Sequence, residues 1–268
     1  MTPCLSQVCS LNSPFDRDLE DFAAAGCTHV EVWLTKLETY LQSHSLKDIL
    51  YWLDKTRLQL AVASIQGGLL ASQGEPRREA WELFTRRLDL CRELNIGTIV
   101  IACDVPAPLS QQTLERVHVS LVQIAQEAGS RGLRAALEFQ ATSAFGNNLQ
   151  TAAALVAEVA SPHLGLCLDA FHWHAGPSKT EDLGYLSADN LFHVQLCDLA
   201  DTPRELAKDS HRILPGEGDI PLAPLIEQLR RINYRGCLAV ELMNPQLWQV
   251  PAVQLADAGL AALRRLIS

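Results

Sequence analysis

The segment AALEFQATSAFGNNLQTAAALVAEVASPHLGLCLDA, residues 135–170, contains two short apolar runs separated by a longer stretch. The runs at 135–139 and 165–170 are almost continuously apolar, which is typical of strands buried on both faces of a sheet. The stretch at 149–159 is a helix candidate. The segment therefore predicts a strand, a helix and a second strand, which together make a parallel βαβ unit.

The same alternation extends over the whole chain, and no linker interrupts it. Strands are expected at 4–10, 29–33, 60–65, 98–103, 135–139, 165–170, 192–197 and 238–242. Helices are expected at 16–25, 46–55, 76–93, 110–130, 149–159, 221–231 and 252–267. Eight strands in strict alternation predict one α/β domain over residues 1–268, a single (β/α)₈ TIM barrel. An open doubly wound sheet is the alternative, but the chain lacks the Gly-x-Gly-x-x-Gly motif of dinucleotide-binding sheets.

Composition excludes several classes of function. Apolar residues make up 48% of the chain and the net charge is −9, so nucleic acid is a disfavoured partner. Eight cysteines without a C-x-x-C pair are typical of reduced thiols, and neither a secretory signal nor a membrane span is visible. We expect a soluble cytoplasmic protein. Helices flanked by Trp52, Trp81 and Trp248 could supply an apolar interface for a homo-oligomer.

Four consecutive predicted strands end in a polar residue, at the edge where barrels of this kind place their active sites. These residues are Glu138, Asp169, Gln195 and Glu241. Burying three converging carboxylates is costly, and a divalent cation would relieve both the burial and the repulsion. An oxygen-rich ligand set suits Mn²⁺ or Mg²⁺, with Co²⁺ or Zn²⁺ as further options. Rim residues or ion-pair partners are the plainer interpretation of each acid taken alone.

Two further residues are candidates for contact with a substrate. His172 follows Asp169 by three residues and could donate to a substrate oxygen or shuttle a proton. Arg212, in the segment HRILPGEGD, could hold an anionic or hydroxyl-rich substrate. A backbone-bonded loop histidine and a solvated loop arginine are the structural alternatives.

Other residues could line the substrate pocket. His193 alternates with Gln195 along one strand, so it shares the same face and lies one layer deeper, where it could support Gln195. Near the ends of the second and third strands lie Glu31, Trp33 and Gln66. Packing at the strand ends would explain these three equally well.

With these residues in place, the chain resembles the xylose-isomerase-like TIM-barrel superfamily. The resemblance covers nearly the whole chain and is carried by D-x-x-H at 169–172, PGEGDI at 215–220 and YRGCLAVE ending at Glu241. It implies one divalent metal at the four strand-end positions and a proton-transferring pair formed by Glu138 and Glu241. It also implies substrate contacts from His172 and Arg212.

One position departs from the pattern of the epimerases in this superfamily. Where they commonly have His-x-His, this chain has His193-Val194-Gln195. Glutamine there is similar to bacterial 3-dehydroshikimate dehydratases, as are VQLCD, HRILPGEGD and VELMNP. The segment LEFQATSAFGNN differs from those dehydratases, which carry aromatic and histidine residues after the first glutamate.

Three functional hypotheses follow. The first is a metal-dependent isomerase or epimerase of a small polyhydroxy carbonyl compound, in which Glu138 and Glu241 move a proton through a metal-bound enediolate. The second is a lyase like the 3-dehydroshikimate or inosose dehydratases, with His172 as the acid that helps to expel water. The third is a non-catalytic barrel that binds a sugar acid. A zinc-dependent nuclease like endonuclease IV is disfavoured by the charge and by too few histidines.

Overall fold

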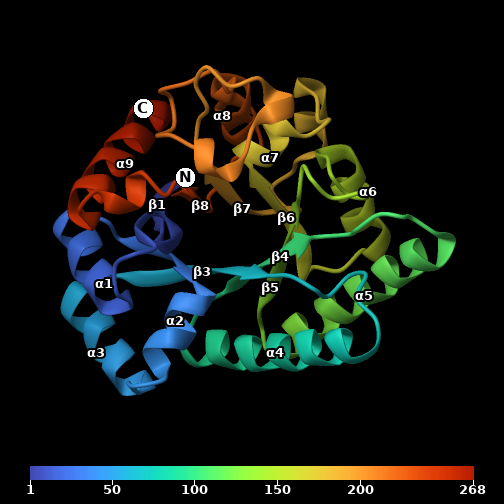
Figure 1. Ribbon diagram of the computed structural model, residues 1–268, viewed down its shortest axis with the longest axis horizontal. Coiled ribbons are helices and arrows are strands. Elements are labelled where there is room, and N and C mark those ends of the chain that lie inside the picture. Colours follow the sequence, from blue (N-terminus) through green and yellow to red (C-terminus); the bar gives the residue numbers. More distant parts are fainter.

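The apolar runs of the sequence form eight parallel strands in the computed structural model, which covers residues 1–268. Each strand pairs with the next in chain order, and the last pairs with the first, which closes the barrel (Figure 1). The predicted TIM barrel is therefore confirmed, and the open sheet is excluded. The strands are β1 Thr2–Ser6, β2 His29–Trp33, β3 Gln59–Gln66, β4 Thr98–Cys103, β5 Arg134–Phe139, β6 Leu164–Asp169, β7 Leu191–Leu196 and β8 Cys237–Val240.

The chain has nine helices, and each contributes buried apolar residues to the main hydrophobic core. The helices lie around the outside of the barrel (Figure 1). They are α1 Phe15–Ala24, α2 Leu34–Leu41, α3 Leu46–Thr56, α4 Gly74–Glu93, α5 Gln111–Ser130, α6 Leu149–Val159, α7 Ala170–Ala175, α8 Leu222–Arg231 and α9 Ala252–Ile267. Five 3₁₀ turns lie in the connections: η1 Gln7–Ser10, η2 Thr180–Tyr185, η3 Arg204–Leu206, η4 Asp209–His211 and η5 Leu247–Gln249. No helix is both long and apolar enough to cross a membrane.

A second, smaller apolar cluster separates from the main core. It consists of Val62, Val100, Ala136, Cys167 and Phe192. Ala136 and Cys167 precede Glu138 and Asp169 by two residues, so each lies on the same face of its strand as the acid that follows. These two side chains put apolar groups beneath the polar ends of β5 and β6. All eight cysteines are free thiols, as predicted.

The first strand is shorter than predicted. It ends at Ser6, and residues 7–10 form the turn η1. The carbonyl oxygens of Gln7 and Ser10 accept hydrogen bonds from the buried ammonium group of Lys36, at 3.3 and 2.7 Å. Its charge is balanced by Asp18, whose Oδ2 lies 2.5 Å from Nζ. The turn therefore directs carbonyl groups toward a buried ammonium group instead of toward a neighbouring strand.

Two helices, α2 and α7, were not predicted. Helix α7 has six residues, too few to show a helical period, and it begins directly after β6. The side chain of Asp169 caps it by accepting a hydrogen bond from the backbone N–H of Phe171 at 2.8 Å. Asp169 thus ends β6 and caps α7, and this fixes the start of the helix that carries His172.

Candidate active site

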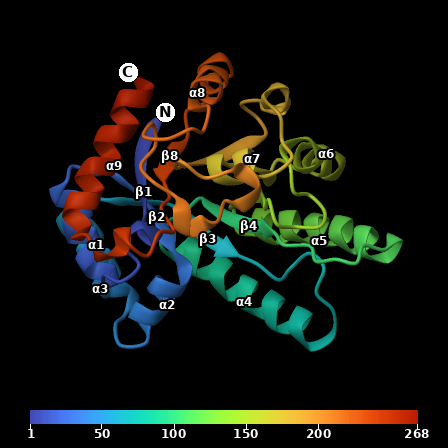
Figure 2. The same ribbon diagram turned by 45° about the horizontal axis from the view of Figure 1, so that its top comes forward.

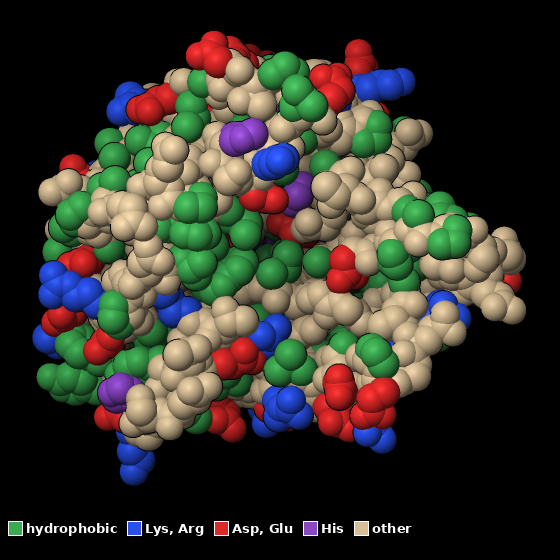
Figure 3. Space-filling view, viewed as in Figure 1, with side chains coloured by type: hydrophobic (Ala, Val, Ile, Leu, Met, Phe, Trp, Pro, Cys, Tyr) green, Lys and Arg blue, Asp and Glu red, His purple; other side chains and the backbone are tan.

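The four strand-end residues predicted as a cluster lie at one end of the barrel. Asp169 pairs in register with Gln195, and the backbone N–H of Glu241 donates to Leu196 O at 3.0 Å. Glu138 pairs with Cys167, two residues before Asp169. All four side chains are buried, with exposed fractions of 4% or less. Figure 3 shows acidic and histidine side chains deep in a hollow near the centre of this face, with apolar side chains on one side.

Glu138, Asp169 and His172 form the tightest group. One ligating atom from each lies within 4.8 Å of the others. Asp169 Oδ2 is buried and accepts no well-aligned hydrogen bond, although it lies 2.7 Å from Arg212 Nη2. Burial, and then the nearby Asp169 carboxylate, raise the pKa of Glu138 well above its usual value. Two acids and a histidine thus face one another, with Arg212 as the neighbouring cation.

His172 is held in one tautomer by the backbone. Its Nδ1 accepts a hydrogen bond from the N–H of Ala141 at 3.3 Å, so in the neutral ring Nε2 carries the proton. Burial lowers the pKa of His172, which favours this neutral form although Asp169 opposes the shift. Nε2 lies 3.8 Å from Asp169 Oδ2. His172 therefore presents a hydrogen-bond donor to the site.

Arg212 is the cation of the cluster and is 1% exposed. Its Nη1 donates to Glu241 Oε2 at 2.8 Å, and its Nη2 lies 2.7 Å from Asp169 Oδ2. Nε and Nη2 donate to Asp209 Oδ1 at 3.0 and 2.6 Å, and the guanidinium lies 4.5 Å from the centroid of the Phe171 ring. The sequence placed Arg212 in the site as a substrate contact; in the structure it also forms ion pairs with three carboxylates.

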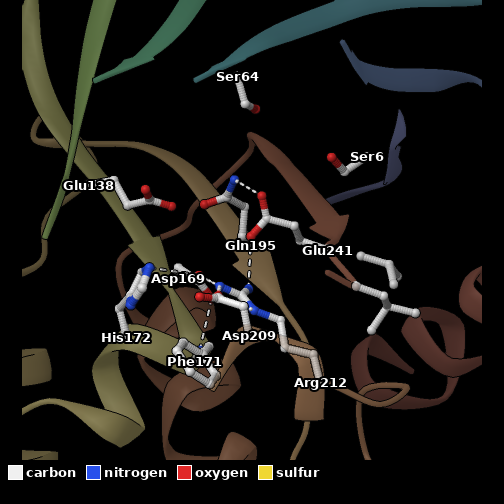
Figure 4. Close-up of polar contacts among 12 residues, drawn as sticks. Ser6, Ser64, Glu138, Asp169, Phe171, His172, Gln195, Asp209, Arg212 and Glu241 are labelled. Carbon is white, nitrogen blue, oxygen red and sulfur yellow. Dashed lines mark hydrogen bonds and ion pairs between the residues drawn. The ribbon is translucent and has the colours of Figure 1, made fainter. Parts of the chain in front are cut away.

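Gln195 and Glu241 contact each other directly. Gln195 Nε2 donates to Glu241 Oε1 at 2.9 Å, and Gln195 Oε1 accepts from the thiol of Cys167 at 3.0 Å. In Figure 4 the amide nitrogen points toward Glu241 and the amide oxygen toward Glu138. Burial raises the pKa of Glu241 well above its usual value, although Arg212 opposes the shift.

A second polar layer lies beneath this one. Glu31 and His193 are both fully buried, and Glu31 Oε2 lies 2.5 Å from His193 Nε2. Glu31 Oε1 accepts hydrogen bonds from Ser6, Ser64 and Gln195. Burial would raise the pKa of Glu31, but His193 and these hydrogen bonds outweigh it and lower the pKa. Neither residue reaches the surface of the hollow, so the structure gives them a supporting position beneath Gln195.

Two predicted pocket residues have no hydrogen bond to the cluster. Gln66 accepts from Arg87 Nη1 at 3.1 Å and donates to Gly67 O at 2.6 Å. Trp33 is partly exposed, and its backbone N–H donates to Gln7 Oε1 at 3.3 Å. Their roles in substrate binding stay predictions, as do the roles assigned to the other site residues.

The sequence analysis missed the residues that support the site. Ser6 and Ser64, on β1 and β3, carry the hydroxyl groups that bind Glu31, and Asp209 pairs with Arg212. Asp198 could have been found, because it is a carboxylate directly after a strand, in VQLCD. The serines carry no signal of their own, since small residues are common inside barrel strands.

Asp198 closes the base of the long connection between β7 and α8. Its Oδ1 accepts from the backbone N–H groups of Leu199 and Ile220, both at 2.9 Å, and its Oδ2 accepts from Gly216 at 2.9 Å. Its backbone also forms an isolated antiparallel bridge with Ile213, next to Arg212. In Figure 2 this connection, drawn in orange, lies over the end of the barrel. Asp198 therefore fixes the backbone on which Arg212 is carried.

Replacing Asp198 by asparagine should loosen this connection. The asparagine amide keeps one acceptor oxygen, and an NH₂ group takes the place of the other. At least one backbone N–H then loses its acceptor, and leaving a buried donor without a partner costs about 1–3 kcal/mol. We expect a lower urea midpoint and reduced turnover, because Arg212 loses its fixed position. The matched control is Asp219→Asn on the same connection, because exposed Asp219 accepts only from Asp201 N at 3.2 Å. Wild-type stability and turnover in Asp198→Asn would contradict this role.

The donor set fits a divalent cation. Glu138 and Asp169 supply buried carboxylate oxygens, and Asp169 Oδ2 is one of four buried side-chain atoms without a well-aligned hydrogen bond. Gln195 Oε1 adds a neutral oxygen on the side that faces Glu138 (Figure 4). Oxygen donors of this kind suit hard cations.

Comparison with known proteins assigns the family. The xylose isomerase-like TIM barrel family matches residues 19–266. The chain belongs to this family. An inosose isomerase from Halalkalibacterium halodurans is 26% identical over 260 residues, which cover 94% of this chain and 91% of that protein. A 3-dehydroshikimate dehydratase from Pseudomonas putida is 26% identical over 268 residues, which cover 95% of this chain but 40% of that protein.

Solved structures of the family share the fold. The crystal structure of the IOLI protein, which contains a zinc atom, superposes with a TM-score of 0.94 at 24% identity and covers 100% of this chain and 98% of that one. The crystal structure of a D-psicose 3-epimerase with D-fructose has a TM-score of 0.78 at 19% identity, with full coverage of both chains. At these identities the likeness shows a shared fold.

Proposed function

We propose that this family member is a divalent-metal-dependent isomerase or epimerase of a small, neutral polyhydroxy ketone. The observation that carries the proposal is the pair of buried glutamates at the end of the barrel. Glu138 and Glu241 lie on opposite sides of the Gln195 amide (Figure 4), and burial raises the pKa of both. Relatives named inosose isomerase, matched over 94% of this chain, support the same class of reaction.

Glu138, Asp169, Gln195 and Glu241 would hold the cation. Bound there, it would polarise the substrate carbonyl and acidify the neighbouring C–H bond. One glutamate takes the proton from the carbon beside the carbonyl, and the electron pair of that C–H bond forms an enediolate. Return of a proton to the adjacent carbon, while the proton of the neighbouring hydroxyl passes to the former carbonyl oxygen, gives an isomer. Return of a proton to the opposite face of the same carbon gives an epimer. A glutamate with a raised pKa suits this work because its carboxylate is a stronger base than an ordinary one.

His172 and Arg212 would orient the substrate. The Nε2–H of His172 is available to donate to a substrate oxygen, because its Nδ1 is occupied by the backbone of Ala141. Arg212 holds Glu241 through Nη1, which aims the carboxylate. Both donors stabilise negative charge that develops on the substrate oxygens.

The charge of the site favours a neutral substrate. Arg212 is the buried cation among the strand-end residues, and it is already paired with Asp169, Glu241 and Asp209. A substrate carboxylate placed there would approach several acids and compete with them for one guanidinium group. Inososes and ketoses carry no such charge, whereas 3-dehydroshikimate does.

A dehydratase is the second candidate, and Gln195 favours it. Relatives named 3-dehydroshikimate dehydratase match 95% of this chain. In this reaction proton removal is the same, but the β-hydroxyl then leaves as water, with the Nε2–H of His172 as the acid.

The test is a proton NMR time course in D₂O with Mg²⁺-loaded protein against ketoses, inososes and 3-dehydroshikimate. We expect deuterium to enter the carbon beside the carbonyl of a neutral ketone and an isomeric product to accumulate. A chelated sample should lose the activity, and Mg²⁺ should restore it. Loss of water to an enone or aromatic ring would establish the dehydratase instead. Deuterium entry unaffected by chelation would contradict the metal dependence.

A further inference from the structure

Glu31 is a carboxylate surrounded by donors. Strand register places it beside Ser6, and it has no solvent exposure. Its Oε1 accepts from Ser6 at 3.2 Å, from Ser64, and from Gln195 Nε2 at 3.0 Å. Its Oε2 lies 2.5 Å from His193 Nε2. Four side chains therefore direct hydrogen-bond donors at this one group, from the three strands β1, β3 and β7.

This arrangement restricts the amide of Gln195. A primary amide has two N–H bonds on nitrogen, and both are directed at carboxylates here, one at Glu31 and one at Glu241. Rotating the amide by half a turn would bring its oxygen against Oε1 of both acids. Two buried carboxylates would each lose a donor and face another oxygen, which is costly for groups with almost no solvent exposure.

The fixed amide leaves its oxygen on the opposite side. Gln195 Oε1 accepts only the weak Cys167 thiol donor, and it points toward Glu138 (Figure 4). Asp169 is the register partner of Gln195 on the neighbouring strand, and its Oδ2 accepts no well-aligned hydrogen bond, although it lies 2.7 Å from Arg212 Nη2. The amide oxygen and the two acids therefore face a common space.

We propose that Glu31, held by His193, is the positioning residue that fixes the Gln195 amide with its oxygen toward Glu138 and Asp169, so that this oxygen can bind a divalent cation. The inference rests on the metal dependence in the proposed function. Glu31 does not touch the cation or the substrate; it acts through Gln195. A glutamine, whose two ends are nearly identical in shape, serves as a ligand here because a neighbour determines which end faces the site.

The test is a calorimetric titration of the chelator-treated protein with Mn²⁺, which needs no substrate. Glu31→Gln replaces one acceptor oxygen by an NH₂ group and frees the Gln195 amide to rotate. We expect Mn²⁺ affinity to fall by roughly 10- to 100-fold, the range for residues that orient metal ligands. Ser64→Ala is the matched control, because it removes a donor to Glu31 without touching Gln195, and it should bind Mn²⁺ nearly as wild type does.

A double-mutant cycle separates positioning from a general loss of charge or structure. If Glu31 acts through Gln195, then Glu31→Gln should cause no further loss in a Gln195→Ala background. Equal losses in both backgrounds, or no loss in the single variant, would overturn the proposal. Should Glu31→Gln fail to fold, Glu31→Asp takes its place, since it keeps the charge but withdraws the carboxylate from Gln195.

The same titration distinguishes this inference from the proposed function. A wild-type protein that binds no Mn²⁺ would overturn both. Mn²⁺ binding without the predicted non-additivity would overturn the positioning role alone. The predicted cycle in a protein that turns over none of the ketones would leave the positioning role supported and remove the isomerase assignment.

Discussion

Glu241→Gln should lose turnover by roughly 10²- to 10⁴-fold, the range for removal of a general acid–base group. The amide cannot take up a proton at neutral pH, and it is close to the carboxylate in shape. Its single oxygen can accept from Gln195 or from Arg212, whereas the carboxylate accepts from both. We therefore expect a folded protein with a modest loss of stability. Turnover is measured by NMR with the ketone that proves active, and Mn²⁺ binding is measured in parallel.

Glu138→Gln, compared with Glu241→Gln, tests whether the two glutamates act as separate bases. If the two glutamates act as separate bases, each single variant should lose product formation but retain slow exchange of one substrate proton with D₂O, catalysed by the glutamate that remains. The double variant should lose the exchange as well. Near-wild-type turnover in either single variant would remove that residue from the mechanism. Loss of Mn²⁺ binding together with turnover would assign the effect to the cation site instead.

Arg212→Met should have the largest effect on stability. Arg212 is 1% exposed and pairs with Asp169 and Glu241, which become buried charges without a partner when it is removed. Breaking one side of a buried ion pair costs about 3–5 kcal/mol. The loss is measured by urea unfolding of the metal-free protein, and turnover should fall as well because Glu241 is no longer held.

Added Mn²⁺ should recover part of this stability. The cation can replace the guanidinium as the counter-charge of the acids, and a ligand that binds only the folded state stabilises it. Arg265→Met is the matched control, because Arg265 is 63% exposed and lies 3.8 Å from Glu217. Exposed pairs of this kind contribute little, so the control should unfold like wild type. An Arg212→Met protein as stable as this control would contradict the ion-pair role.

Most of the barrel could be predicted because its strands are apolar on both faces and its helices are long enough to show their period. Helix α7 could not, since six residues after β6 show no period and its start depends on the cap from Asp169. The end of β1 could not either. It depends on Lys36, whose contact with residues 7 and 10 is formed only in the folded chain.

The predicted site had the same limit. Strand ends place Glu138, Asp169, Gln195 and Glu241 together because parallel strands in a barrel end at one rim. The ion pairs of Arg212 depend on the path of a long connection, which no local pattern encodes. The direction of the Gln195 amide depends on Glu31, on a strand far away in the sequence, so the sequence predicted the residue but not which of its atoms faces the site.

The bonds made by Asp198 have a consequence for how this enzyme family could diversify. They hold residues 213, 216 and 220 but not residues 200–208, which bond to the rest of the chain through Asp201 and Arg204 instead. Closing a longer loop between fixed ends costs little, because the entropy of closure grows only with the logarithm of its length. Residues 200–208 can therefore be replaced by segments of other length and sequence at little cost in stability. Segments grafted there could alter what enters the barrel while Arg212 stays in place.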